Sequence, residues 1–396
     1  MLLPTLKEQT VPRIVVVSAC RTPQGRFLGG LASSSAAQLG AIAAEASLAR
    51  ASIAPDAIDQ VIVGNVLGAG LGQNVARQVA MGARVPVGCP AFSVNMMCAS
   101  GLQAVALAAQ AIAAKNASVV LCGGVESMSR APYLLERART GYKLGHGNLV
   151  DSILRDGLTD SFTDKHMGEC LEAMARQKSI SRSRQDAFAL RSQERAAAAK
   201  ARGAFADELV AVGKVTEDEH PRADTTLAAL SALKPAFASE GGNVTAGNAS
   251  GINDGAAMLV VCSENTAKAH GWKPLAVFAG CASAGCEPEQ FGIGPVLATR
   301  ALCDRYGYTL GQFDTVELNE AFAAQALACI DGLALDADKV NPDGGAIALG
   351  HPIGASGARL VVHLAHRIAR GESSRALATL CVGGGMGIAA ALETYR

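Results

Sequence analysis

The sequence predicts an α/β fold made of two duplicated halves with a loop domain inserted between them. One observation is that β-branched segments alternate with Ala-rich helical segments at both ends of the chain, which favours a largely parallel sheet covered by helices on both faces. The other is that an Ala-Ser-Gly turn opens an apolar helix twice, at 99–101 and 355–357, 256 residues apart. Each helix leads to a strand that ends in Cys and glycines, and Cys122 and Cys381 are 259 residues apart. This nearly constant offset indicates a duplication.

The elements of the first half follow in order along the chain. A β-branched run at 13–18 indicates a strand buried on both faces, and the Ala/Leu spacing at 35–52 predicts a helix. A second strand is expected at 60–65. Residues 92–102 form a strand–turn–helix unit, and the apolar helix at 102–114 is too short and too rich in glutamine to cross a membrane.

The same alternation returns from 274 to 389, with a strand at 313–319 and a second strand–turn–helix unit at 350–358. Between the halves, residues 126–250 hold much of the charge and an exposed amphipathic helix at 179–202. A long insert at the edge of a rigid scaffold is a usual place for substrate recognition, and an oligomer-forming loop region is the alternative. The expected divisions are an N-terminal half (1–125), the inserted loop domain (126–250), a return to the N-terminal half (251–273) and a C-terminal half (274–396).

Composition excludes several classes of protein. Lys plus Arg and Asp plus Glu balance at 35 each, and aromatic residues make up 4%, so neither nucleic acid nor a membrane is an expected partner. The eleven cysteines are scattered, without a Cys-x-x-Cys pair or a His/Cys cluster at zinc spacing. This pattern favours a reduced, cytoplasmic protein without a metal site. Residues 1–8 lack the basic and apolar runs of a secretory signal.

Reactive side chains stand at the duplicated turns. Cys98 lies at a helix start, where unpaired backbone N–H groups and the helix dipole lower a thiol pKa and favour the thiolate. A buried, unreactive cysteine is the plainer interpretation. His351 stands in a Gly-His-Pro segment, where the proline fixes the backbone and the glycines leave room around the ring, which does not suit a core residue. His363 and His366 are interpreted as ordinary structural or surface histidines.

Two further segments carry polar or reactive groups. Cys381 opens Cys-Val-Gly-Gly-Gly-Met-Gly, whose glycines expose backbone N–H groups. The segment lacks the Lys-Ser/Thr of a phosphate-binding loop, so an oxyanion site is the better interpretation. Asn319 follows a strand and begins a helix, where an N-cap role is common and does not exclude a second role.

Six segments together resemble the thiolase family. In chain order they lie at 95–101, 123–129, 245–256, 319–322, 350–357 and 381–387. The resemblance covers nearly the whole chain after the first ten residues, and six segments in the family's order make coincidence implausible. It implies the thiolase fold, in which two βαβαβαββ halves form a layered αβαβα arrangement with an inserted loop domain.

The resemblance implies an acyl-CoA C-acyltransferase of fatty acid metabolism, which condenses two acetyl-CoA to acetoacetyl-CoA plus CoA or cleaves short 3-ketoacyl-CoA by thiolysis. It makes Cys98 the acyl-accepting nucleophile, His351 the group that activates it, and Cys381 the acid/base at the α-carbon. Asn319 would hold a water that stabilises the enolate oxygen together with His351. Backbone N–H groups of Cys98 and Gly383 would form the second oxyanion hole. Coenzyme A thioesters are the substrates, and such chemistry needs no metal or redox cofactor.

The resemblance also implies residues that bind coenzyme A and the acyl group. His166 and Met167 match the His-Met-Gly segment that lines the acyl and pantetheine pocket of short-chain thiolases. Together with Phe237 they are bulky and are expected to close the pocket to long chains. The other matching positions are Arg222, Ala246, Ser250, Ala321 and Phe322. The chain departs from the family pattern at Met96, Met97 and 169–172, which bears on the acyl preference and not on the catalytic groups.

Three other functions compete with this interpretation. A non-catalytic carrier of acyl chains would not require the four reactive groups. A decarboxylating ketoacyl synthase shares the fold but pairs its cysteine with two histidines, whereas this chain has Asn319 and Cys381. Within the family, a broader-chain degradative 3-ketoacyl-CoA thiolase is the alternative. The loop at 136–154 resembles the one that ties family dimers together, so we expect a homotetramer that is a dimer of dimers.

Overall fold

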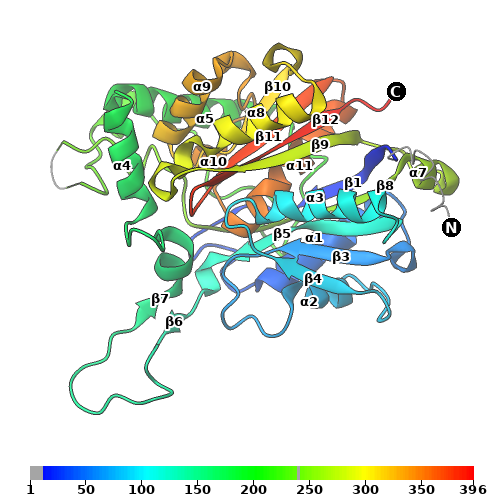
Figure 1. The fold of residues 1–396 in the computed structure, drawn as a ribbon, viewed down its shortest axis with the longest axis horizontal. Helices are drawn as coiled ribbons and strands as arrows, with labels where there is room; N and C mark the ends of the chain where they lie inside the picture. The colour runs from blue at the N-terminus through cyan, green and yellow to red at the C-terminus, as the bar shows by residue number, and fades with distance from the viewer. Residues whose placement is uncertain (1–11, 239–240) are drawn as a thin grey trace, which may run out of the picture.

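The computed structural model describes residues 12–238 and 241–396, and the expectation for residues 1–8 lies outside them. One mixed ten-stranded sheet dominates the molecule (Figure 1). Its strands are β1 (Ile14–Arg21), β2 (Gly25–Arg26), β3 (Gln60–Gly64), β4 (Ala91–Val94), β5 (Val119–Ser127), β8 (Asn253–Ser263), β9 (Ala276–Gly285), β10 (Thr315–Leu318), β11 (Arg375–Val382) and β12 (Met386–Glu393). A second sheet pairs β6 (Tyr133–Leu134) with β7 (Val150–Asp151).

The helices fall into a scaffold set and an insert set. The scaffold helices are α1 (Ala36–Arg50), α2 (Val75–Gly82), α3 (Ser100–Ala113), α7 (Glu264–His270), α8 (Gly294–Tyr306), α9 (Ala323–Leu333), α10 (Ala346–Leu349) and α11 (Ile353–Ala369). The insert helices are α4 (Met167–Gln177), α5 (Arg182–Ala201) and α6 (Leu227–Ser231). No helix in the described part of the chain is long and apolar enough to cross a membrane.

The large sheet consists of two half-sheets that meet along a short seam. The first half-sheet has the strand order β1-β8-β5-β3-β4, and the second has the order β9-β12-β11-β10. The seam is two residue pairs long, Val15 with Val277 and Val16 with Ala276. Because so few hydrogen bonds join them, the half-sheets can diverge and leave space for helices between them.

The expectation of a largely parallel sheet is wrong. Within the described residues, β3 pairs in parallel with β4 and β5, and β10 with β11, while the other pairings of the large sheet are antiparallel. β8 runs antiparallel to both β1 and β5, and β12 folds back on β11 through the turn at 383–385. A β-branched run indicates that a strand is buried on both faces, but it carries no information about the strand's direction.

The layered αβαβα arrangement expected from the sequence is confirmed. α3 and α11 lie between the two half-sheets, where apolar side chains from both sheets pack on them (Figure 1). α1 and α2 cover the outer face of the first half-sheet, and α8 and α9 cover the outer face of the second. α11 is therefore buried on all sides over nearly its whole length, whereas α3 leaves Gln110 exposed.

The two central helices cross at matched glycines. A Cβ atom at Gly101 would lie 2.7 Å from Ala358 N, and one at Gly357 would lie 2.6 Å from Leu102 N. Both contacts are too short for a side chain, so glycine is required for the backbones to approach this closely. Gly101 and Gly357 are 256 residues apart, the same offset as the repeated turns. The duplication seen in the sequence is thus also a pseudo-twofold relation in the core.

The second strand–turn–helix unit differs from the prediction. β4 precedes the Cys98 turn and α3 as expected, but the short helix α10 precedes His351 and α11. β10 is an edge strand of the large sheet, and where the first half has β4 the second has only an isolated bridge between Val316 and Val340. Without a paired neighbour, residues 346–349 are free to form a helical turn.

The insert packs on the C-terminal half and sends out a hairpin. The helix expected at 179–202 is α5, and it buries one face, including Gln185 and Phe188, against neighbouring helices. The segment that carries β6 and β7 projects away from the body of the molecule (Figure 1).

His363 is a structural histidine, as expected, because its ring lies between Glu208 Oε2 at 2.9 Å and Asp343 Oδ2 at 3.0 Å.

Candidate active site

One cavity of about 410 Å³ brings together all the predicted site residues except Asn319. The cavity lies between the half-sheets and the insert, and residues of the two halves and of the insert form its walls. The predicted residues that line it are Cys98, His166, Met167, Arg222, Phe237, Ala246, Ser250, Ala321, Phe322, His351, Cys381 and Gly383. Asn319 is fully buried directly behind His351.

A tight turn before α3 directs Cys98 into this cavity. Met97 has φ 47°, a left-handed conformation that costs roughly 1 kcal/mol for a residue other than glycine. Side chains at both ends hold the turn: Asn95 Oδ1 accepts from Met97 N at 2.9 Å. Ser100 Oγ accepts from Met96 N at 2.9 Å and donates to Met97 O at 2.7 Å. A strained backbone fixed by local hydrogen bonds is frequent at reactive groups.

The expectation that the helix start favours the Cys98 thiolate is wrong. Burial raises the pKa of Cys98 to about 11, and the charge of Glu126 adds to this, although backbone N–H groups of Gly383 and Cys98 itself act in the opposite direction. α3 begins at Ser100 with Ala99 as its N-cap, so Cys98 precedes the helix. Desolvation in an apolar cavity outweighs the dipole. Cys98 is therefore a thiol at neutral pH and requires a base.

His351 is held as a neutral base. Ser356 Oγ donates its only proton to Pro352 O at 3.0 Å, so we assign the proton shared with His351, at 2.6 Å, to ring nitrogen Nδ1. Nε2 then carries a lone pair and accepts from Asn319 Nδ2 at 3.4 Å. Burial, together with the charge of Arg359, lowers the pKa of His351 to about 3. The ring is thus neutral and can take a proton at Nε2.

Asn319 is not a helix N-cap, because α9 begins at Ala323 with Phe322 at the cap position. Its backbone N–H donates to Thr379 O at 3.0 Å, which fixes it at the end of β10. Its side-chain Oδ1 is buried and has no hydrogen-bond partner among the described residues. A buried amide oxygen normally has a partner, so an unpaired one beside His351 indicates a functional position.

Cys381 is the second thiol of the cavity and stands at the end of β11. It is fully buried, and the turn at 383–385 follows it. Its pKa is raised well above the usual thiol value, first by burial and then by the neighbouring Cys98. The N–H of Gly383 in the same turn points to the Cys98 sulfur. β11 and its turn therefore supply both an acid/base group and an anion-binding donor.

Aromatic rings from three segments form one wall of the cavity. His166 caps α4, because its Nδ1 accepts from Gly168 N at 3.0 Å, and its ring stacks on Phe237 with 4.7 Å between ring centroids. Phe237 meets Phe322 edge to face at 6.3 Å. Burial lowers the pKa of His166, so this wall is uncharged.

Sequence reasoning missed several residues of the cavity. Met128 and Ile252 lie in two of the six segments that resemble the thiolase family, at 123–129 and 245–256. Their apolar side chains beside the polar residues of these segments could have indicated a place in the cavity wall. Leu154, Leu158 and Phe291 carry no signal in the sequence, since tertiary packing alone brings them to the cavity. The cavity also adjoins a smaller one of about 240 Å³ that shares His220, Arg222 and Ala246 with it. The two cavities therefore adjoin at these three residues of the insert.

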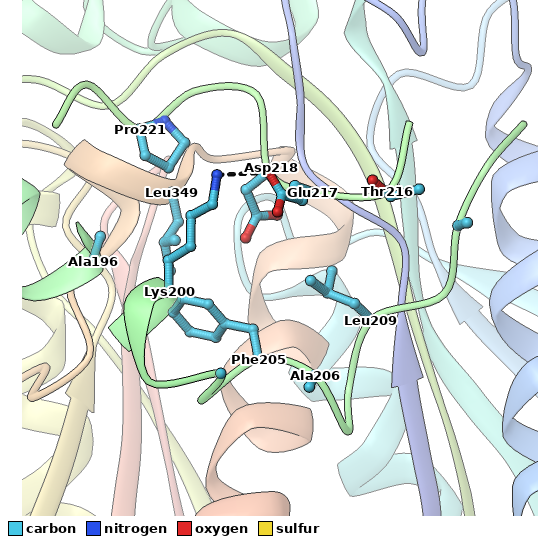
Figure 2. Close-up of a pocket in the computed structure, with 12 residues that line it drawn as sticks. Ala196, Lys200, Phe205, Ala206, Leu209, Thr216, Glu217, Asp218, Pro221 and Leu349 are labelled. Carbon is cyan, nitrogen blue, oxygen red and sulfur yellow. Dashed lines mark hydrogen bonds and ion pairs between the residues drawn. The ribbon is translucent and has the colours of Figure 1, made fainter. Parts of the chain in front are cut away.

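A further cavity of about 390 Å³ lies beside the loop at 216–221 (Figure 2). Lys200 and Glu217 form an ion pair of 2.6 Å across it, above the apolar side chains of Phe205, Leu209 and Leu349. Neither cysteine nor histidine lines this cavity.

Comparisons with known proteins match nearly the whole chain. Residues 14–265 match the family described as "Thiolase, N-terminal domain", and 272–394 match "Thiolase, C-terminal domain". The acetyl-CoA acetyltransferase of Escherichia coli is 51% identical over 388 residues, which cover 96% of this chain and 98% of that protein. The acetyl-CoA acetyltransferase of Chromobacterium violaceum is 49% identical over 389 residues, 96% and 99% of the two chains. The crystal structure of human mitochondrial 3-ketoacyl-CoA thiolase in complex with CoA has a TM-score of 0.95 at 42% identity, covering 97% of this chain and 98% of that one.

Proposed function

The chain belongs to the thiolase family and is an acyltransferase, and we propose that its reaction is that of an acetyl-CoA C-acyltransferase. The reaction is the reversible condensation of two acetyl-CoA to acetoacetyl-CoA plus CoA, or thiolysis of short 3-ketoacyl-CoA, through an acyl group on Cys98. The observation that carries the proposal is a single cavity that holds Cys98, His351 and Cys381. The relatives named acetyl-CoA acetyltransferase support the choice of substrate.

Acyl transfer starts from the neutral thiol of Cys98. His351 takes the thiol proton at Nε2, because Nδ1 already donates to Ser356. The sulfur attacks the thioester carbonyl carbon, the bond from that carbon to the CoA sulfur breaks, and the CoA sulfur receives the proton of the Cys381 thiol. Cys381 is then a thiolate, and the proton of Cys98 stays on His351. One thioester replaces another, so the step is close to isoenergetic and reversible.

The carbon–carbon bond forms or breaks at the α-carbon of a second acyl-CoA. In condensation, the Cys381 thiolate takes a proton from the α-carbon, the carbanion attacks the carbonyl of the acyl group on Cys98, and the Cys98 sulfur leaves and recovers its proton from His351. In thiolysis, the Cys98 sulfur attacks the 3-keto carbon and Cys381 protonates the departing carbon. CoA then gives its thiol proton to Cys381 and takes the acyl group from Cys98, whose sulfur recovers its proton from His351. The raised pKa of Cys381 suits this acid role, because the resting thiol holds its proton.

Two sets of donors stabilise the oxyanions of these steps. Backbone N–H groups of Cys98 and Gly383 lie at the Cys98 sulfur, where they can donate to the carbonyl oxygen of its acyl group. Asn319 lies 3.4 Å from His351 Nε2, so the two side chains converge where an enolate oxygen, or a water bound to it, would lie. Such preorganised donors are usually the largest single contribution to catalysis of acyl transfer.

The cavity offers separate places for the coenzyme and the acyl group. The path past Arg222 and Ala246 suits the CoA moiety, with the guanidinium near its phosphates. Bulky apolar side chains also line the cavity, among them Met128, Leu158 and Phe291, and we expect them to close it to long chains together with His166, Met167 and Phe237. A closed end favours short chains, since each methylene in an apolar pocket changes binding by ~1–3 kcal/mol and overpacking adds a steric cost.

Acyl-enzyme mapping tests the proposal directly. Incubation with acetyl-CoA and digestion should place one acetyl group on the peptide that contains Cys98. Acetylation of another residue would show that the nucleophile is wrongly assigned.

The degradative 3-ketoacyl-CoA thiolase is the second candidate, because the human mitochondrial 3-ketoacyl-CoA thiolase has the same fold over 97% of this chain. A thiolysis series over chain length separates the two. We expect kcat/KM to be highest at four or five carbons and to fall steeply by ten. Equal efficiency with the ten-carbon substrate would favour the degradative candidate.

We also propose a homotetramer made as a dimer of dimers. The projecting segment between β6 and β7 exposes large apolar side chains, with Tyr133, Leu144 and Leu149 63%, 100% and 65% exposed. Exposed apolar side chains on a projecting arm favour contact with other subunits. Light scattering should give a mass near four times 40.3 kDa. A monomer at micromolar concentration would contradict the assembly, and a stable dimer would contradict only the role of this loop.

The proposed place of action is the cytoplasm, within fatty acid metabolism. The eleven cysteines are all free in the structure, which suits a reducing compartment. The proposed chemistry is completed by thiols, an imidazole and amide groups, so we propose that it proceeds without a metal or redox cofactor.

A further inference from the structure

A carboxylate that the proposed chemistry does not use is completely buried beside the cavity. Glu126 Oε1 accepts from Asn65 Nδ2 at 2.8 Å and from Leu67 N at 3.2 Å. Its Oε2 accepts from Val66 N at 3.1 Å and from Gly354 N at 3.0 Å. Four donors thus converge on two oxygens. An ionised carboxylate satisfies all four, because it has acceptor positions only.

The donors belong to the loop that lies under the Cys98 turn and to the helix that follows His351. The loop that follows β3 lies under the Cys98 turn, where Val66 O accepts from Asn95 Nδ2 at 3.4 Å. The side chains of Val66 and Leu67 pack in one apolar cluster with Cys98. On the other side, Gly354 N lies in the first turn of α11, three residues after His351.

α11 lacks a capping side chain of its own. Its N-cap residue is Pro352, which makes no side-chain cap hydrogen bond. Glu126 supplies a capping acceptor from the opposite half of the molecule, in the place where a negative group is most favourable. The N-terminus of α11 and the loop under Cys98 are therefore joined through one side chain.

We propose that Glu126 is a positioning residue that holds the His351 loop in register with the Cys98 turn, so that the imidazole can take the thiol proton. The inference rests on the proposed roles of Cys98 and His351. The electrostatics agree with this placement, because the charge of Glu126 is close enough to contribute to the raised pKa of Cys98. The pKa of Glu126 is itself raised to about 7 by burial, against which its four donors act.

Glu126→Gln tests the proposal, since it keeps the size of the side chain but turns an NH₂ group toward N–H donors. We expect kcat to fall by about 10- to 100-fold, as is usual when a group that orients a reactive residue is lost. KM for the acyl-CoA should stay within about threefold, because Glu126 does not line the cavity. The rate of Cys98 alkylation by iodoacetamide, measured without substrate at neutral pH, should fall about tenfold because it depends on the same proton transfer. Loss of the Glu126 charge alone acts in the opposite direction, because that charge raises the pKa of Cys98, so a slower reaction reports the loss of positioning.

Asp59→Asn is the matched control. Asp59 Oδ2 accepts from Ser118 N at 2.7 Å and Val119 N at 2.9 Å, so it is a carboxylate that holds backbone N–H groups at the opposite end of β5. The Asp59→Asn substitution should lower stability but keep kcat and the alkylation rate within about twofold of the wild-type values, because Asp59 is remote from the cavity. Equal losses in both variants would overturn the proposal, as would wild-type kcat and alkylation in folded Glu126→Gln.

Glu126→Asp provides a second test if the Gln variant does not fold. It keeps the acceptors but is one methylene shorter, so both rates should lie below those of the wild type; wild-type rates would overturn the proposal. The alkylation assay also separates this inference from the proposed function. If the protein lacks thiolase activity but Cys98 alkylation responds to Glu126 as described, the positioning role stands and the proposed reaction falls.

Discussion

Asn65 and Asn319 stand at matching places in the two halves of the molecule, yet their side chains make different contacts. Each follows a strand, β3 or β10, and each donates its backbone N–H to a carbonyl of a neighbouring segment. Asn65 Nδ2 donates to Glu126 Oε1 at 2.8 Å and to Val125 O at 3.3 Å, and so belongs to the buried network around Glu126. Asn319 Nδ2 faces His351, and its Oδ1 has no partner among the described residues. One half uses the asparagine to build structure, and the other leaves it available to a ligand.

The halves remain alike at the opposite ends of the same strands. Asp59 Oδ2 accepts from Ser118 N and Val119 N, and Asp314 Oδ2 accepts from Ser374 N and Arg375 N at 2.7 and 3.3 Å. The two aspartates are 255 residues apart. The comparison teaches that divergence is concentrated at the strand ends that face the cavity, while the remote ends kept their common hydrogen bonds.

The largest effect should come from Cys98, whose matching position in the second half is Gly354. Cys98→Ala removes the acyl carrier, so kcat should fall by at least about 10⁴-fold, as for other covalent nucleophiles. Steady-state thiolysis of acetoacetyl-CoA measures this, with circular dichroism to verify folding. Activity within tenfold of the wild type would rule out Cys98 as the nucleophile.

The asparagine pair should separate activity from stability. Asn319→Ala should lower kcat by about 10²- to 10³-fold with little change in stability, because it removes an oxyanion donor that the fold does not use. Asn65→Ala should lower the free energy of unfolding by about 1–3 kcal/mol, since it leaves Glu126 short of a buried partner, and should cost less activity. Urea unfolding and kcat measured on both variants check this. The reverse order of effects would contradict the comparison.

Ser100 and Ser356, also 256 residues apart, form the next matched pair. Ser356→Ala frees Nδ1 of His351, so the ring can adopt the wrong tautomer, and kcat should fall by about 10- to 100-fold. Ser100→Ala removes hydrogen bonds of the Cys98 turn and should cost about 1 kcal/mol of stability. The Ser356 effect should appear in kcat rather than KM, and an unchanged kcat would refute the tautomer assignment.

His351→Asn gives the second half the residue found at the matching position of the first, Asn95. The folded-state pKa of His351 is lowered to about 3 from 6.5, so on acidification the unfolded chain takes the proton first. Stability from this residue is therefore complete above pH 6.5 and is lost as pH falls toward 3, by about 2 kcal/mol at pH 5. The variant should lose correspondingly less stability between pH 7 and pH 5, measured by urea unfolding. Parallel pH profiles of the two proteins would contradict the lowered pKa.

The smallest effects should come from the remote aspartates. Asp59→Asn and Asp314→Asn each weaken two backbone hydrogen bonds near the surface, so each should cost about 0.5–1.5 kcal/mol, and kcat should change less than about twofold. Thermal unfolding of both variants shows whether the two substitutions lower stability by the same amount. A much larger loss in one half would show that the remote ends have diverged as well.

The sequence by itself determined most elements and the residue types that meet in the cavity. The strand at 13–18 and the helix at 35–52 appear as β1 and α1, shifted by no more than a few residues. The repeated Ala-Ser-Gly turns appear as the starts of α3 and α11. Such features depend on neighbours within one or two helical turns along the chain, so local spacing contains the information that predicts them.

Only the tertiary structure decided the directions of the strands, the protonation of the reactive groups and the residues that hold them. The local sequence predicts a thiolate at Cys98, but the half-buried thiol lies in a cavity that residues of both halves line, and this desolvation raises its pKa. The neutral ring of His351 and the carboxylate of Glu126 have the same origin, since each depends on donors and apolar neighbours far away in the sequence. The free energy of a charged group in a protein depends on desolvation, nearby charges and hydrogen bonds, and residues from distant parts of the chain supply these. A local sequence pattern therefore does not predict the protonation state.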